Sequence, residues 1–154
     1  MLTNTNDLIA DFVRVAMLSG LSIIERDIAH QTLRAPHTQP TLPDNSQAVY
    51  VFSLSNLPFT VLKVGKVGPN SNARFQSQHY NPNSAGSNLA KSLLNQKDVW
   101  EQLGIQSLTE RNVGEWIRKH TDRDHFFLSA NQAALCLSLL EVVVQCRLHP
   151  VFEG

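Results

Sequence analysis

Two apolar runs near the middle of the chain, residues 48–53 and 60–67, are rich in Val, Phe and Tyr and are separated by a polar break. β-Branched and aromatic residues favour strands, and two such runs around a short polar segment are typical of a β-hairpin. A third run of this kind, residues 124–128, predicts another strand. The pattern therefore predicts a small three-stranded sheet, either mixed or antiparallel.

Apolar residues at helical spacing surround these strands. Asn6 or Asp7 can cap a first helix, and a second helical stretch follows and reaches Leu33. Residues 35–47 contain three prolines and no apolar period, which marks a linker. Further helices are predicted at residues 89–103, 110–120 and 132–149, and the last has apolar side chains around nearly its whole circumference.

These elements predict an α/β domain over residues 47–154, in which helices flank the small sheet. An N-terminal helical arm and linker, residues 1–46, precede this domain. An amphipathic arm usually covers the core of its own chain, and the alternative is that it supports a homodimer or a protein partner.

The composition fits one domain with a single core, because the chain has 154 residues of which 42% are hydrophobic. The formal net charge is zero, which argues against a general electrostatic binder of nucleic acid. Residues 47–128 nevertheless hold nine basic and six acidic side chains. This local excess either follows a phosphate backbone or is ordinary variation of a solvated surface.

Cys136 and Cys146 both fall in the last predicted helix. Ten helical positions separate them by about 15 Å along the axis, so they cannot pair with each other. Two buried, reduced thiols favour a cytoplasmic protein. The sequence also has no secretory leader and no apolar run long enough to span a membrane, so we expect no membrane association.

The predicted hairpin carries candidate chemistry. If it folds symmetrically about Asn56 and Leu57, Tyr50 lies directly opposite Lys63, with Cβ atoms roughly 5 Å apart on one face. A nearby ammonium favours phenolate, so we expect Lys63 to lower the pKa of Tyr50. The alternative is an ordinary amphipathic hairpin face, which accounts for either residue alone.

A possible phosphate receptor follows the hairpin. The Gly-Pro-Asn turn at residues 68–70 precedes Ser71 and Asn72, either of which can cap a helix. The first turn of that helix then holds Arg74. An arginine beside the free N–H groups of a helix start is suited to binding a phosphate.

One carboxylate, Glu141, interrupts the apolar pattern of the last helix. Charged side chains are rarely buried unless they are paired or bind a metal. The residues alone leave two interpretations open: Glu141 lies on a narrow exposed stripe with Ser138 and Gln145, or it is a metal ligand.

Ala48-Val49-Tyr50, followed by Lys63-Val64-Gly65 and a downstream arginine, resembles the motif pattern of the GIY-YIG nuclease family. Lysine stands where the family's second tyrosine is expected, as in some restriction enzymes of the family. The stretch around Glu141, with Leu148-His149-Pro150 after it, resembles the family's terminal helix, in which a glutamate ligates the metal. The resemblance therefore favours the metal-ligand interpretation of Glu141.

The resemblance implies a set of roles. Glu141 would hold one divalent cation, Mg²⁺ with Mn²⁺ as a substitute, and Arg74 would clamp the scissile phosphate. Tyr50, beside Lys63, would be the base or would orient the attacking water. The remaining candidates are a neighbouring phosphate contact at Lys66, a proton-moving or positioning group at His79, and Tyr80, which could take the place of His79 or bind substrate.

These roles predict a metal-dependent endonuclease that hydrolyses phosphodiester bonds in DNA. Two other classes stay open. One is a catalytically degenerate nucleic-acid-binding module, because the second tyrosine of the motif is missing. The other is a protein-interaction domain of the same fold, in which Glu141 is merely exposed.

Overall fold

The computed structural model describes residues 4–57 and 59–152, which form a mixed α/β fold around a four-stranded antiparallel sheet. The strand order is β1-β4-β2-β3, with bounds Ala29–Leu33 for β1, Ser46–Leu54 for β2, Val61–Val67 for β3 and Thr121–Ser129 for β4. The six α-helices of the described residues are α1 (Thr5–Leu18), α2 (Asn72–Gln76), α3 (Leu89–Asn95), α4 (Asp98–Leu103), α5 (Val113–His120) and α6 (Ala134–Leu148). Two short 3₁₀ turns, η1 (Glu25–Asp27) and η2 (Gln78–Tyr80), complete the chain.

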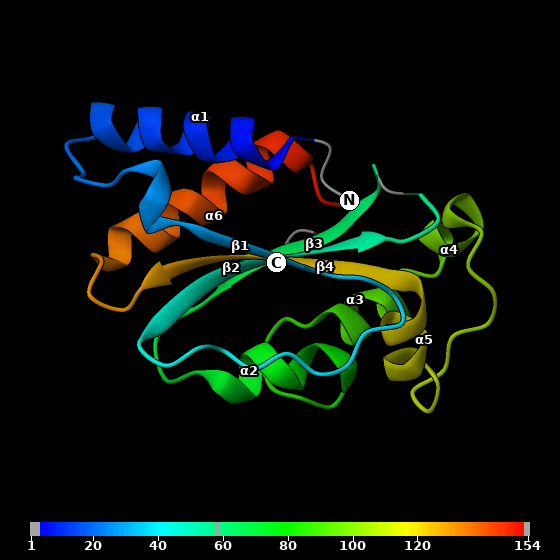
Figure 1. Cartoon of the computed structure of the whole chain (residues 1–154). Helices are drawn as coiled ribbons and strands as arrows, with labels where there is room; N and C mark the ends of the chain where they lie inside the picture. Colours follow the sequence, from blue (N-terminus) through cyan, green and yellow to red (C-terminus); the bar gives the residue numbers. More distant parts are fainter. Residues whose placement is uncertain (1–3, 58, 153–154) are drawn as a thin grey trace.

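Helices cover both faces of the sheet (Figure 1). On one side α1 and α6 pack together over the strands, and on the other side lie α2, η2, α3 and α5. Two separate groups of buried apolar side chains fill these layers. We call the two sides the α1/α6 face and the α2/α5 face.

Strand β2 lies between β4 and β3, and the helices on the two sides of the sheet cover both of its faces. Every residue from Gln47 to Leu54 is buried, which agrees with the nearly continuous apolar run in this part of the sequence. Alternate side chains point to opposite faces of a strand. Tyr50 and Phe52 therefore enter the α2/α5 face, while Val49 and Val51 enter the α1/α6 face.

The predicted three-stranded sheet is wrong by one strand. The second predicted helix does not form. Instead residues Ala29–Leu33 pair with β4 as an antiparallel edge strand. β-Branched residues such as Ile28 and Thr32 suit a strand at least as well as a helix, so tertiary pairing decides the outcome. One of these pairs places Thr32 opposite Asp124, whose carboxylate accepts a hydrogen bond from the Thr32 hydroxyl.

The predicted register of the hairpin is also wrong. Tyr50 lies opposite Gly65, and Lys63 lies opposite Phe52. The loop closes one residue later than expected, with the Leu54 N–H bonded to the Thr60 carbonyl at 3.0 Å, and a bulge between Phe52 and Ser53 adds a second shift. Because side chains alternate with a period of two, two single-residue shifts return Lys63 to the face of Tyr50.

Two predicted helices differ from those observed. The predicted helix over residues 89–103 is two helices, α3 and α4, separated at Gln96 and Lys97. Helix α6 is buried along one stripe only, because Leu135 is 70% and Val142 50% exposed.

Both cysteines are free as expected, but only Cys136 is buried, whereas Cys146 is exposed. In the part of the chain that the structure describes, no helix has the length and hydrophobicity to cross a membrane.

Candidate functional site

Tyr50 occupies the centre of the α2/α5 face, where its side chain is fully buried. Its ring extends over Gly65 of the neighbouring strand, so a Cβ atom at position 65 would overlap with the phenol oxygen. Glycine is therefore needed at this position for Tyr50 to lie flat over β3. Within the described residues the hydroxyl has no hydrogen bond of ordinary geometry, although the Arg74 guanidinium lies close enough to lower the pKa of Tyr50 through its charge and a hydrogen-bond interaction.

Lys63 enters the same face two residues before Gly65, diagonal to Tyr50. Its side chain is almost completely buried, and its Nζ donates a hydrogen bond to Ser87 Oγ at 3.0 Å. An amine at this position is unusual in an apolar layer, because burial disfavours its charged form.

Arg74 lies in the first turn of α2, as the sequence predicts, and is exposed. It forms no ion pair with a carboxylate of the described residues. Its charge instead lowers the pKa values of Tyr50, Lys63 and His79, so the guanidinium lies near all three side chains. An exposed arginine that lacks an acidic partner can accept an external anion.

His79, in η2, packs against Tyr50 with ring centroids 4.6 Å apart and edge-on geometry. Its Nδ1 accepts a hydrogen bond from the Leu89 N–H at 3.3 Å, which makes Nδ1 the unprotonated nitrogen. Its Nε2 is buried without a partner in the described part of the chain. Of the two alternatives in the sequence, His79 is therefore the neighbour of Tyr50. Tyr80 is buried and its hydroxyl accepts a hydrogen bond from Arg123 Nη1 at 3.0 Å, so this hydroxyl makes an internal contact.

Burial dominates the electrostatics of these groups. It raises the pKa of Tyr50, an effect that the charges of Arg74 and Arg123 only partly offset. It lowers the pKa of Lys63, and the charge of Arg74 lowers it further. The pKa of His79 is well below its usual value for the same reason, so this ring is neutral near pH 7. The expectation that Lys63 lowers the pKa of Tyr50 is thus wrong, because desolvation outweighs the neighbouring charges.

Glu141 approaches from the other side of the sheet. It lies on α6, and its carboxylate pairs with Lys66 Nζ at 2.7 Å, on the α1/α6 side of the edge strand β3. Lys66 also donates to Ser138 Oγ at 3.2 Å, so its amine serves this contact rather than standing free for a phosphate. The negative charge of Glu141 still acts across the edge strand on Tyr50 and Lys63, where it opposes the loss of the Lys63 proton.

The residues around Glu141 bear on the expected metal. Among the described residues no group of three or more His, Cys, Asp or Glu side chains could hold a metal ion. Mg²⁺ commonly uses only one or two carboxylates and takes its other ligands from water and substrate phosphate. Glu141 is 18% exposed and meets this minimal requirement, provided that Lys66 releases it.

Sequence reasoning missed Arg123 and His125, which point from β4 into the same face and are both fully buried. His125 lies directly opposite Tyr50, and burial lowers its pKa to about 2. A signal was available. Four consecutive polar side chains, residues 122–125, lead into the strand predicted at residues 124–128, so they alternate between its two faces, and a strand covered on both faces buries both sets.

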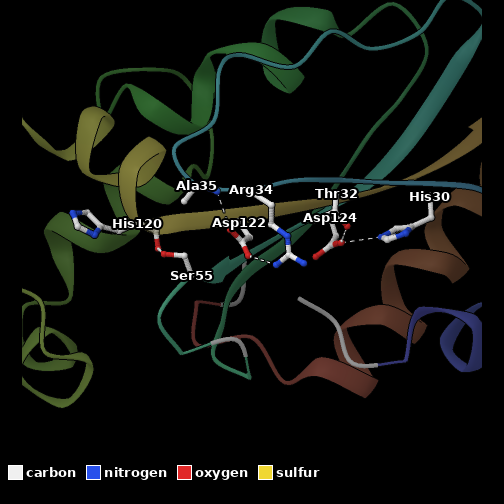
Figure 2. Close-up of polar contacts among 8 residues, drawn as sticks. All are labelled: His30, Thr32, Arg34, Ala35, Ser55, His120, Asp122 and Asp124. Carbon is white, nitrogen blue, oxygen red and sulfur yellow. Dashed lines mark hydrogen bonds and ion pairs between the residues drawn. The ribbon is translucent and has the colours of Figure 1, made fainter.

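The charged residues on the other side of β4 form a separate polar cluster toward β1 (Figure 2). Arg34 pairs with Asp122 at 2.8 Å, and His30 Nε2 lies 2.8 Å from Asp124 Oδ1. Thr32 donates its hydroxyl to Asp124 as well. These contacts join the edge strand to the sheet on the α1/α6 side, away from Tyr50.

A hollow of about 430 Å³ opens beside Arg74. Its lining combines polar groups with small residues: Asn70, Ser71, Ala73, Arg74, Gln78, Ala85 and Gly86. The guanidinium can therefore be reached from solvent at the rim of the buried group formed by Tyr50, Lys63 and His79.

Comparisons with models of known protein families, with curated proteins and with solved structures found no match to this chain.

Proposed function

We propose that this chain is a divalent-metal-dependent endonuclease that hydrolyses phosphodiester bonds in DNA. One observation carries the proposal: Tyr50, Lys63 and His79 meet on one face of the sheet beside Arg74, an exposed arginine without an acidic partner among the described residues. Such a guanidinium is suited to a phosphate diester. The resemblance of the sequence to GIY-YIG nucleases supports the same assignment.

The buried groups suggest a division of labour. Arg74 binds the scissile phosphate from the hollow at its side. Tyr50 keeps its proton near pH 7 because its pKa is raised, so it orients the attacking water by hydrogen bonding. Lys63, whose pKa is lowered, is the better proton acceptor of the two. Neutral His79 supports the Tyr50 ring, and its Nε2–H, which has no partner among the described residues, is the hydrogen-bond donor that it can offer for substrate positioning.

Glu141 is the residue that would hold the divalent ion, because it is the carboxylate whose charge acts on Tyr50 and Lys63. When bound, such an ion polarises a phosphate oxygen and stabilises the leaving oxygen. Lys66 competes for the same carboxylate, so its ammonium must turn away when the ion binds.

The decisive experiment incubates single-stranded and double-stranded DNA with the protein in Mg²⁺, in Mn²⁺ and in EDTA. We expect cleavage with either ion and none in EDTA. Removing a phosphate clamp costs about 10²–10³ in rate, and removing a positioning hydroxyl about 10². Arg74→Ala and Tyr50→Phe should therefore reduce kcat/KM by these factors.

Arg14→Ala is a matched control, because Arg14 is an exposed arginine of α1 on the other side of the sheet. It should cleave at the rate of the unmodified protein. Gly65→Ala is a second probe, since its new methyl group displaces the Tyr50 phenol without removing any functional group. Full activity of Gly65→Ala or of Arg74→Ala would contradict the proposed site.

The ion pair between Lys66 and Glu141 favours a second candidate, a nucleic-acid-binding module without catalytic activity. In that case Glu141 serves only to fix Lys66, and Arg74 still binds phosphate. Salt-sensitive DNA binding without cleavage under any divalent ion would support this candidate. If the protein neither cleaves nor binds DNA, the protein-interaction domain of the same fold becomes the better assignment.

A further inference from the structure

Arg123 is a fully buried guanidinium in the middle of the α2/α5 face. No carboxylate of the described residues pairs with it, and its Nε has no hydrogen-bond partner there. A buried charge without a countercharge destabilises a fold, and an apolar side chain of similar size is often better tolerated. Stability alone therefore does not explain an arginine at this position.

The contacts of Arg123 connect two segments of the proposed site. Nη2 donates to the Phe75 carbonyl at 2.9 Å, and Nη1 donates to the Tyr80 hydroxyl at 3.0 Å. Phe75 follows Arg74 in α2, and Tyr80 follows His79 in η2. One guanidinium thus fixes the backbone next to Arg74 and the side chain next to His79 to the central sheet.

The aromatic rings around Arg123 hold it in place. Its Cζ lies 4.6 Å from the ring centre of Phe52, 4.9 Å from that of Phe75 and 5.7 Å from that of Tyr50. Contacts of a cation with aromatic faces are favourable at these distances. They offset part of the cost of burial and fix where the two hydrogen bonds point.

Helix α2 needs such an anchor. It has five residues, and its N-cap residue Ser71 makes no side-chain cap hydrogen bond. Isolated helices of this length are not stable in water. The direction of Arg74 therefore depends on tertiary contacts, and one of them is the hydrogen bond from Arg123 to the Phe75 carbonyl.

We propose that Arg123 is a positioning residue that holds α2 and η2 so that Arg74 and His79 converge on Tyr50. What the positioned groups do rests on the proposed function, whereas the positioning itself is a property of the free protein and can be tested without DNA.

The first test is amide hydrogen exchange of the unliganded protein. In Arg123→Met, the amides of Phe75, Ser77 and Tyr80, which are bonded within α2 and η2, should exchange at least about tenfold faster, while those of α6 stay unchanged. Arg118→Met is the matched control, because Arg118 also stacks on the Tyr80 ring, at 4.5 Å, but makes neither hydrogen bond. Unchanged exchange in α2 and η2, or equal acceleration in all elements, would overturn the proposal.

Tyr80→Phe covers the case in which Arg123→Met does not fold. It removes only the hydroxyl that accepts from Arg123 Nη1, so exchange should rise in η2 and remain unchanged in α6. No change in η2 would show that this hydrogen bond does not position the segment.

The second test separates positioning from general stability. At saturating DNA with Mg²⁺, Arg123→Met should lower kcat about 10²-fold, since small misplacements of binding groups cost this much. The Kd for DNA in EDTA should change less than about threefold, and Arg123→Lys should not restore kcat because it lacks the two-pronged guanidinium. A loss of kcat that vanishes on cooling, or full rescue by lysine, would contradict positioning. If the unmodified protein does not cleave DNA, the proposed function fails, and the exchange experiment still decides the role of Arg123.

Discussion

The two faces of the sheet bury polar groups in different ways. On the α1/α6 face, the buried or half-buried carboxylates have close partners: Arg34 for Asp122, His30 and Thr32 for Asp124, and Lys66 for Glu141. On the α2/α5 face, Tyr50, His79, Arg123 and His125 contribute five of the seven buried side-chain atoms without a hydrogen-bond partner in the described residues. Apart from the Lys66–Glu141 pair, whose carboxylate is the proposed metal ligand, the first arrangement stabilises the fold, whereas the second is costly and marks the face that we assign to function.

The difference extends to the apolar packing. The α1/α6 face is built mainly from aliphatic side chains, together with Phe12, Phe126 and Cys136. The α2/α5 face instead stacks tyrosine, histidine and phenylalanine rings around a guanidinium. Substitutions on the two faces should therefore separate stability from activity, and four experiments test this contrast.

The largest effect is expected from Phe12→Ala on the α1/α6 face. Phe12 is completely buried, so its removal should lower the free energy of unfolding by about 3–5 kcal/mol. Urea denaturation measures this change. Because Phe12 lies far from Tyr50 across the sheet, the folded fraction should cleave DNA at the normal rate. A large loss of activity per folded molecule would mean that the two faces are coupled.

The second effect concerns acid. Burial lowers the pKa of His125 to about 2, so between pH 6.5 and pH 2 the unfolded chain binds a proton that the folded chain does not. The contribution of neutral His125 to the free energy of unfolding is therefore fully present above pH 6.5. It falls as the pH decreases, by roughly 2 kcal/mol at pH 5. Urea denaturation at several pH values measures the slope, to which His79 adds in the same direction. His125→Phe should reduce the slope of the free energy of unfolding against pH by the equivalent of one bound proton. An unchanged slope would contradict the buried neutral imidazole.

The third experiment should show a gain in stability. Lys63→Met removes a buried amine whose one hydrogen bond within the described residues goes to Ser87, and keeps an unbranched chain of similar length. We expect about 1 kcal/mol of added stability together with a loss of cleavage of at least about 10²-fold. Thermal denaturation and the cleavage assay measure the two quantities. Lower stability of Lys63→Met would show that the amine stabilises its surroundings.

The smallest change in stability is expected from Glu141→Gln. The ion pair with Lys66 is 39% exposed at the lysine and 18% at the glutamate, so its loss should cost under about 1 kcal/mol. Metal-dependent cleavage should nevertheless disappear if Glu141 holds the ion. Glu115→Gln, which breaks the exposed pair with Lys119, is the matched control and should leave cleavage unchanged. Normal cleavage by Glu141→Gln would remove its assignment as the metal ligand.

Sequence reasoning located the hairpin, the strand at the end of α5 and the long final helix, because strong apolar periods specify these elements. It missed β1, since residues that are both amphipathic and β-branched leave the choice of helix or strand to tertiary pairing. It grouped Tyr50, Lys63 and Arg74, which the structure brings near one another, with Glu141 as a predicted metal ligand, but could not foresee Lys66 as the partner of Glu141. That contact depends on how α6 lies on β3, which no local pattern encodes.

The electrostatic expectation failed for a related reason. Spacing brings Lys63 near Tyr50, but the pKa of each follows from burial on all sides. Burial of the α2/α5 face comes from residues far along the chain, including Arg123 and the rings around it. A pairwise argument from two residues therefore gave the right face and the wrong direction for the Tyr50 pKa.

The bulge between Phe52 and Ser53 has a consequence for how this hairpin can change in evolution. Deleting one loop residue alone would exchange the faces of Lys63 and Lys66, sending one lysine away from Tyr50 and the other away from Glu141. A deletion that also removes the bulge would leave both lysines where they are. Natural variants of this segment should accordingly differ in length by even numbers of residues, or compensate an odd change at the bulge.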